Sequence, residues 1–131
     1  MKYNQVENFV NGDFTTVASK RLLPVISPSD GTFLTELPCS STADLDLAVN
    51  AAKTAFQSWS KTPIKERVQV FFRYKALLEK NINDLAALGS EENGKTISES
   101  IAEIEKCIEL TEFACSLPQL ITGEILEVSK G

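Results

Sequence analysis

The chain has 131 residues, of which 43% are hydrophobic and 24% charged, and its formal net charge is −5. This composition is typical of one ordinary globular unit, and its acidic balance argues against nucleic-acid binding because the phosphate backbone attracts clustered lysine and arginine. The longest uncharged apolar runs are far shorter than a bilayer span, so we expect protein or neutral partners and no membrane insertion.

The first part of the chain predicts short β-strands. Residues 8–16 read as two strands joined at Asn11 and Gly12, because a type I′ hairpin turn requires positive φ at both central residues and Asn-Gly adopts it at low cost. Residues 21–26 form another apolar run. Within it Pro24 cannot donate a ladder hydrogen bond and therefore favours an edge strand.

A turn and a change of periodicity follow. Residues 27–31 (SPSDG) predict a turn, and residues 32–37 alternate weakly as a further strand. Beyond this strand the apolar residues recur at three- and four-residue steps, which is typical of helices. We therefore expect a β-strand region over residues 1–40 and a helical layer over residues 41–131, both parts of one unit.

The first two predicted helices have recognisable start signals. Ser41 with Asp44 three residues later resembles a capping box, and Thr62 followed by Pro63 predicts a cap and a proline at the first helical position. One face of the first helix carries Leu45, Ala48, Val49, Ala52, Ala55, Phe56 and Trp59. The second helix has more than one apolar stripe, so we expect it to be covered on two sides. Its apolar residues are Ile64, Val68, Val70, Phe71, Phe72, Tyr74, Leu77 and Leu78.

Two more helices are predicted after a break at residues 81–83. Gly94 is placed to close the shorter one in the left-handed conformation, and Thr96 with Glu99 predicts a capping box for the longer one. Pro118 is expected to end or kink that longer helix. The apolar seam of the longer helix is Ile97, Ile101, Ile104, Ile108, Thr111 and Cys115.

A family resemblance rests on motifs around this longer helix. An E-x-G-K turn at residues 92–95 leads into it, and Phe113, Ala114, Gly123 and Glu124 follow. In this order they resemble the long helix near the front of aldehyde dehydrogenases, most closely the branch that oxidises methylmalonate and malonate semialdehydes. The resemblance covers nearly the whole chain. It implies an α+β fragment, mainly α-helical with short N-terminal β-strands including a hairpin, within the α/β nucleotide-binding domain of that fold.

The resemblance also implies a function for the full-length protein. That protein would oxidise an aldehyde through a thiohemiacetal, pass hydride to NAD or NADP, and release the acyl group to water or coenzyme A. Residues 1–131 would be the incomplete N-terminal part of its nucleotide-binding domain, inert alone and structural in role. We expect this part to bind the remainder of the same enzyme or to self-associate through apolar helix faces, and the full-length protein to be a homo-oligomer. The alternative is a non-enzymatic helical module that binds a partner through its apolar surface.

We expect no cofactor to be bound by this chain alone. A dinucleotide needs a glycine-rich strand-to-helix turn whose N–H groups meet the pyrophosphate. The six glycines are too scattered to form such a turn. They are Gly12, Gly31, Gly89, Gly94, Gly123 and Gly131.

No catalytic or metal-binding residue is expected either. A reactive thiol needs a nearby cation or a helix N-terminus. Cys39 instead follows a strand, Cys107 lies in mid-helix and Cys115 continues the apolar seam, so we expect packing or incidental thiols. The general base and oxyanion donor that the resemblance implies are expected beyond Gly131. Three cysteines without histidine predict neither a disulfide framework nor a zinc site, and the N-terminus resembles no signal or transit peptide, so we expect a cytoplasmic protein.

One residue is a candidate for substrate binding. In the semialdehyde branch an arginine on the long helix holds the substrate carboxylate, and the resemblance places Lys106 at that position. Lysine offers a compact point charge where arginine offers a planar two-pronged donor, so the match is one of charge. An E-I-E-K-C run also resembles the equivalent helix of some succinate semialdehyde dehydrogenases. The alternative is that Lys106 is a solvated lysine beside Glu103, Glu105 and Glu109.

Overall fold

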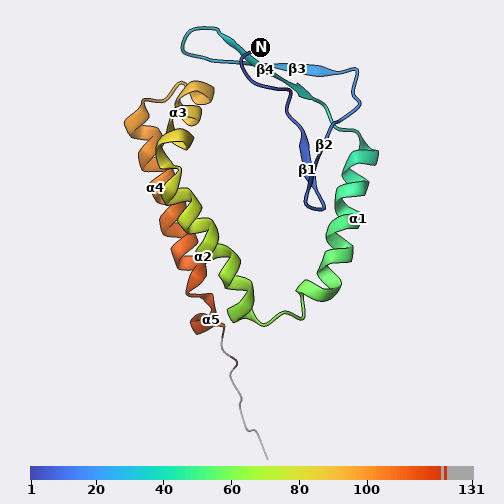
Figure 1. Ribbon diagram of the computed structural model, residues 1–131, viewed down its shortest axis with the longest axis vertical. Helices are drawn as coiled ribbons and strands as arrows, with labels where there is room; N and C mark the ends of the chain where they lie inside the picture. Colours follow the sequence, from blue (N-terminus) through green and yellow to red (C-terminus); the bar gives the residue numbers. More distant parts are fainter. Residues whose placement is uncertain (122, 124–131) are drawn as a thin grey trace, which may run out of the picture.

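A computed structural model describes residues 1–121 and 123, so Glu124 and Gly131 lie outside the described residues. The strands are β1 (Asn8–Val10), β2 (Asp13–Thr15), β3 (Leu22–Ile26) and β4 (Phe33–Pro38). The helices are α1 (Thr42–Trp59), α2 (Ile64–Lys80), α3 (Ile82–Asn93), α4 (Ile97–Cys115) and α5 (Leu117–Leu120). The β3–β4 pair lies at one end of the molecule, with α1 on one side and the packed helices α2, α3 and α4 on the other (Figure 1).

The predicted hairpin is confirmed. Strands β1 and β2 pair antiparallel with Phe9 opposite Phe14, and the two rings lie 5.0 Å apart between centroids. The turn residues Asn11 and Gly12 have φ values of 56° and 92°. Positive φ at both positions is what a type I′ turn requires, so the Asn-Gly pair determines this local structure.

The second pair, β3 and β4, is also antiparallel, and Pro24 lies opposite Glu36. Within the described residues β3 pairs with β4 alone, which confirms the expected edge strand. The N-terminal segment follows β4 along its other side. There the backbone N–H of Tyr3 donates to the Leu34 carbonyl at 2.9 Å, and the N–H of Val6 donates to the Glu36 carbonyl at 3.1 Å.

Helix α1 begins with the predicted capping box, because the Ser41 hydroxyl accepts from the Asp44 N–H while the Asp44 carboxylate accepts from the Ser41 N–H. Its alanine side meets the hairpin, since Ala48 and Ala52 line a shallow cavity with Val10. No residue of α1 is buried by the part of the chain that the structure describes. The large side chains of its predicted apolar face are exposed, and they are Leu45, Val49, Phe56 and Trp59.

The predicted start of α2 is wrong by one position. Pro63 is the N-cap residue and helical geometry begins at Ile64, with no side-chain cap bond at this end in the described structure. The Thr62 hydroxyl accepts no N–H of α2 within the described residues, and it donates to the Ser58 carbonyl in the last turn of α1 at 3.3 Å. Proline fits this junction since it has no N–H to satisfy.

The core of the helical layer lies where α4 packs against both α2 and α3. The buried residues of this core are Val68 and Leu78 of α2 and Ala86 of α3. From α4, Thr111 and Cys115 are buried and the middle of the predicted seam is half-buried, whereas Ile97 at its start is exposed. The seam is therefore confirmed except at its first residue, which lines an open cavity beside α3.

Helix α2 is covered on one side by the described residues, although two sides were expected. Large apolar groups of this helix remain exposed, and these are Val70, Phe71, Phe72, Tyr74 and Leu77. An apolar surface of this kind is unusual on a soluble monomer and marks a place where another chain segment or molecule binds.

The predicted helix ends are confirmed. Gly94 closes α3 in the left-handed conformation at φ 73°, and its N–H donates to the Ser90 carbonyl at 2.8 Å. Helix α4 ends at Cys115, just before Pro118, which lies in the first turn of the short α5. No helix of the described chain combines the length and apolar character needed to cross a membrane.

Candidate functional site

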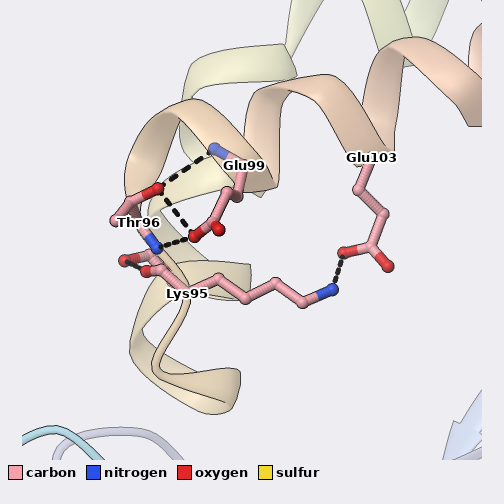
Figure 2. A network of polar contacts seen from close by, with 5 residues as sticks. Lys95, Thr96, Glu99 and Glu103 are labelled. Carbon is pink, nitrogen blue, oxygen red and sulfur yellow. Dashed lines mark hydrogen bonds and ion pairs between the residues drawn. The ribbon is translucent and has the colours of Figure 1, made fainter.

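The candidate substrate contact, Lys106, lies on α4. The position at which this helix begins determines the side of the helix on which Lys106 lies. The Glu99 N–H donates to the Thr96 hydroxyl at 3.3 Å, and the Thr96 N–H donates to the Glu99 carboxylate at 2.9 Å (Figure 2). The backbone hydrogen bond from Thr96, followed by its hydroxyl bond, lowers the pKa of Glu99. This reciprocal pair satisfies two N–H groups that the first turn would otherwise leave open.

A second polar contact crosses the next turns of α4. Lys95, which precedes the cap, extends along the helix and donates to the Glu103 carboxylate at 2.7 Å (Figure 2). Glu103 is therefore already engaged by a cation from the loop that ends α3. This long-range choice of partner was not predicted, because no local spacing rule relates residues eight positions apart.

Lys106 projects from α4 into solvent. Its side chain is 67% exposed, and its ammonium group forms an ion pair with Glu109, whose side chain is 65% exposed. Of the three carboxylates expected beside it, Glu109 alone pairs with Lys106 among the described residues. Since Lys106 lies away from the seam, it is free to meet a ligand or another part of the protein.

Two apolar side chains lie beside this lysine. Leu110 and Phe113 are each 62% exposed. They follow Lys106 by four and seven residues, and such residues share one side of a helix. A cation next to exposed apolar groups suits a molecule with a carboxylate at one end and a short carbon chain. The four-residue spacing between Lys106 and Leu110 is visible in the sequence, but Leu110 was not predicted from it as a second contact.

The three cysteines are not brought together. Cys39 is half-buried after β4, Cys107 is exposed in the middle of α4, and Cys115 is buried at its end. Cys115 thus packs in the core as expected. None of the three lies in the first turn of a helix within the described residues, so the structure offers no helix N-terminus to activate a thiol.

A large open cavity of about 660 Å³ lies between the N-terminal segment, the β3–β4 turn and α3. Within it Glu91 binds two groups of the N-terminal segment. The Tyr3 hydroxyl donates to the Glu91 carboxylate at 2.6 Å, and the Lys2 ammonium pairs with the same carboxylate. These hydrogen bonds, first from Lys2 and then from Tyr3, lower the pKa of Glu91. The cluster acts as a clasp between the N-terminus and α3.

The described residues of this chain provide no glycine-rich turn for a dinucleotide. Gly12 and Gly31 lie in turns with open space around their Cα atoms, and Gly94 ends a helix. Gly89 lies within α3, where an added Cβ would come 3.5 Å from the Ser100 hydroxyl. In the described residues, then, no glycine joins a strand to a helix N-terminus, which is where a pyrophosphate binds. Nor do the described residues contain a group of three potential metal ligands.

Comparison with known proteins shows which family the chain matches. The sequence model of the aldehyde dehydrogenase family matches residues 14–131. A malonate-semialdehyde dehydrogenase of Halalkalibacterium halodurans is 39% identical over 122 residues, which are 93% of this chain and 25% of that protein. The chain thus spans about a quarter of the length of the curated relatives it matches.

Solved structures share the arrangement of these elements. A methylmalonate-semialdehyde dehydrogenase from Oceanimonas doudoroffii superposes with a TM-score of 0.88 at 33% identity, over 93% of this chain and 25% of that one. An NAD-dependent benzaldehyde dehydrogenase from Corynebacterium glutamicum superposes with a TM-score of 0.87 at 29% identity, over 95% of this chain and 27% of that one. The fold is therefore shared by enzymes whose names indicate an acidic and a neutral aldehyde.

Proposed function

Because this chain belongs to the aldehyde dehydrogenase family, we propose that it is the N-terminal portion of an enzyme that oxidises a semialdehyde carrying a carboxylate. The proposed hydride acceptor is NAD or NADP, and the proposed products are an acid or, where coenzyme A accepts the acyl group, an acyl thioester. The role proposed for this chain is to support the fold and to hold the far end of the substrate.

The observation that carries this proposal is the exposed cation Lys106 beside Leu110 and Phe113 on α4. A semialdehyde has a carboxylate at one end, a short carbon chain and a carbonyl at the other. The ammonium group of Lys106 would bind the carboxylate, and the two apolar side chains would contact the carbon chain. The carbonyl would then lie toward groups outside this chain, where the bond changes occur.

Relatives support an acidic substrate more than a neutral one. The matched malonate-semialdehyde dehydrogenases are up to 40% identical over 121 residues, whereas the benzaldehyde dehydrogenase is 29% identical. Family membership does not select the substrate, because both classes share the fold. In this proposal the charge of Lys106 selects acidic over neutral substrates, although a lysine binds a carboxylate less specifically than an arginine does.

The full-length protein is proposed to be a cytoplasmic homo-oligomer. Its three cysteines are free in the structure, which fits a reducing compartment. In this proposal the remaining three quarters of the enzyme or a second subunit covers the exposed apolar groups of α1 and α2. The same surfaces also fit the competing hypothesis of a non-enzymatic module that binds a partner.

Steady-state kinetics of the full-length protein test this function. Malonate, methylmalonate and succinate semialdehydes are compared with neutral aldehydes of equal chain length, each with NAD and with NADP. We expect a higher kcat/KM for the acidic aldehydes and no turnover by residues 1–131 alone. Equal kcat/KM for acidic and neutral aldehydes would contradict the proposed substrate class, and a full-length protein without any oxidation would favour the binding module.

A further inference from the structure

Two glutamates flank Lys106 at the same distance along α4. Glu103 lies three residues before it and Glu109 three residues after it, so either could form an ion pair with the lysine on the helix surface. In the described structure Lys106 pairs with Glu109 and not with Glu103. The two positions are alike in sequence and differ in the structure.

Lys95 causes this difference. Its ammonium group lies 2.7 Å from the Glu103 carboxylate (Figure 2). Lys95 reaches that carboxylate because Gly94 turns the chain through a left-handed residue and the capping box holds Thr96 at the start of α4. Glu103 is thereby neutralised by a cation of its own, and among the residues that the structure describes Lys106 has Glu109 as its one paired counter-ion.

We propose that Glu109 is a specificity-determining residue, an internal counter-ion that the substrate carboxylate must displace from Lys106. This inference rests on the function proposed above. The pair is exposed on both sides, at 67% and 65%, so it is weak enough to exchange for another carboxylate. A neutral aldehyde neither needs the exchange nor gains from it. Glu109 therefore lowers the affinity for acidic substrates and leaves the affinity for neutral aldehydes unchanged, so it sets how strongly the enzyme prefers a substrate carboxylate.

Four variants of the full-length enzyme test this inference: Glu109→Gln, Glu103→Gln, Lys106→Ala and the double variant Lys106→Ala with Glu109→Gln. Glutamine keeps the size of the side chain and removes its charge. We expect Glu109→Gln to lower KM for an acidic semialdehyde by about two- to fivefold, the range of an exposed ion pair, and to leave KM for a neutral aldehyde unchanged. Glu103→Gln is the matched control and should change neither value, because Lys95 already neutralises that carboxylate.

The double variant separates a specific pair from a general charge effect. In the Lys106→Ala background we expect Glu109→Gln to have no effect on KM, since the lysine that it restrains is absent. An unchanged or raised KM in Glu109→Gln, or an equal decrease in Glu103→Gln, would overturn the counter-ion role while leaving the proposed function in place. Equal effects of Lys106→Ala on acidic and neutral aldehydes would instead overturn the Lys106 contact of the proposed function, and equal kcat/KM of the unaltered enzyme for the two aldehydes would overturn its substrate class. Thermal melting of all four variants shows that each is folded.

Discussion

The Tyr3 hydroxyl donates a hydrogen bond of 2.6 Å to the Glu91 carboxylate, across a separation of 88 residues in the sequence. Lys2 pairs with the same carboxylate. Because the N-terminal segment also bonds to β4 through the Tyr3 backbone, this clasp connects the strands to α3. It is a contact between the two expected regions of the chain.

Removing the clasp should lower stability. Tyr3→Phe deletes the hydrogen bond and keeps the ring, so we expect the Tm of the full-length protein to fall by a few degrees at most, because the group is exposed. Tyr74→Phe is the control, since Tyr74 is also exposed and makes no side-chain hydrogen bond within the described residues. Equal Tm values for the two variants, measured by calorimetry, would show that the Tyr3 bond contributes nothing.

The clasp should also be lost in acid. Its bonds lower the pKa of Glu91 below the ordinary value of 4.5, so its stabilising effect is present above that value and disappears as pH falls through the folded pKa. We compare the Tm of the unaltered protein and of Glu91→Gln from pH 7 to pH 3. The difference should shrink below about pH 4.5, and a constant difference would contradict this account. Asp30, the other carboxylate that acts on Glu91, is unchanged in both proteins.

The cap of α4 should contribute measurably. Thr96→Ala removes an acceptor for the Glu99 N–H, and we expect a loss of about 0.5 to 2 kcal/mol in the free energy of unfolding. Thr96→Ser keeps the hydroxyl and should retain most of the free energy of unfolding that alanine loses. Chemical denaturation of both variants measures the difference. If alanine and serine have the same effect, the loss comes from the methyl group and not from the cap.

Lys106 should affect acidic substrates selectively. In the full-length enzyme, Lys106→Ala should raise KM for an acidic semialdehyde by roughly tenfold or more, if the lost contact contributes about 1.5 to 3 kcal/mol. A neutral aldehyde of similar length should be almost unaffected. Lys106→Arg should retain or improve binding of the acidic substrate, because a guanidinium can bind both carboxylate oxygens. A rise in KM of the same size for both aldehydes would make Lys106 an ordinary surface lysine.

The isolated chain should self-associate through α2. Phe71 and Phe72 of this helix are exposed, and we expect light scattering to show association that rises with concentration. Replacing both with serine should reduce the association, whereas Gln69→Ser on the same helix should not. A monomer over a wide concentration range, without binding of a hydrophobic dye, would indicate that residues 1–131 form a complete domain.

Local features were predictable because their causes lie within a few residues. The Asn11-Gly12 turn, both capping boxes and the left-handed Gly94 each depend on backbone conformation or on a hydrogen bond across three or four positions. The Thr62 cap was predicted by the same rules and is wrong, because α2 begins one residue later and Pro63, which has no side-chain oxygen, occupies the cap position. Local rules identify candidates, and neighbouring groups decide between them.

The partners of side chains far apart in the sequence were decided by tertiary structure. The residues alone indicated a cation at Lys106 among three carboxylates, and they could not show that Glu103 belongs to Lys95 while Glu109 belongs to Lys106. The Tyr3 and Glu91 contact had no signal at all in the sequence. Such pairs depend on where whole helices and strands pack, which is determined by the summed burial of many apolar groups and not by the spacing of any two residues.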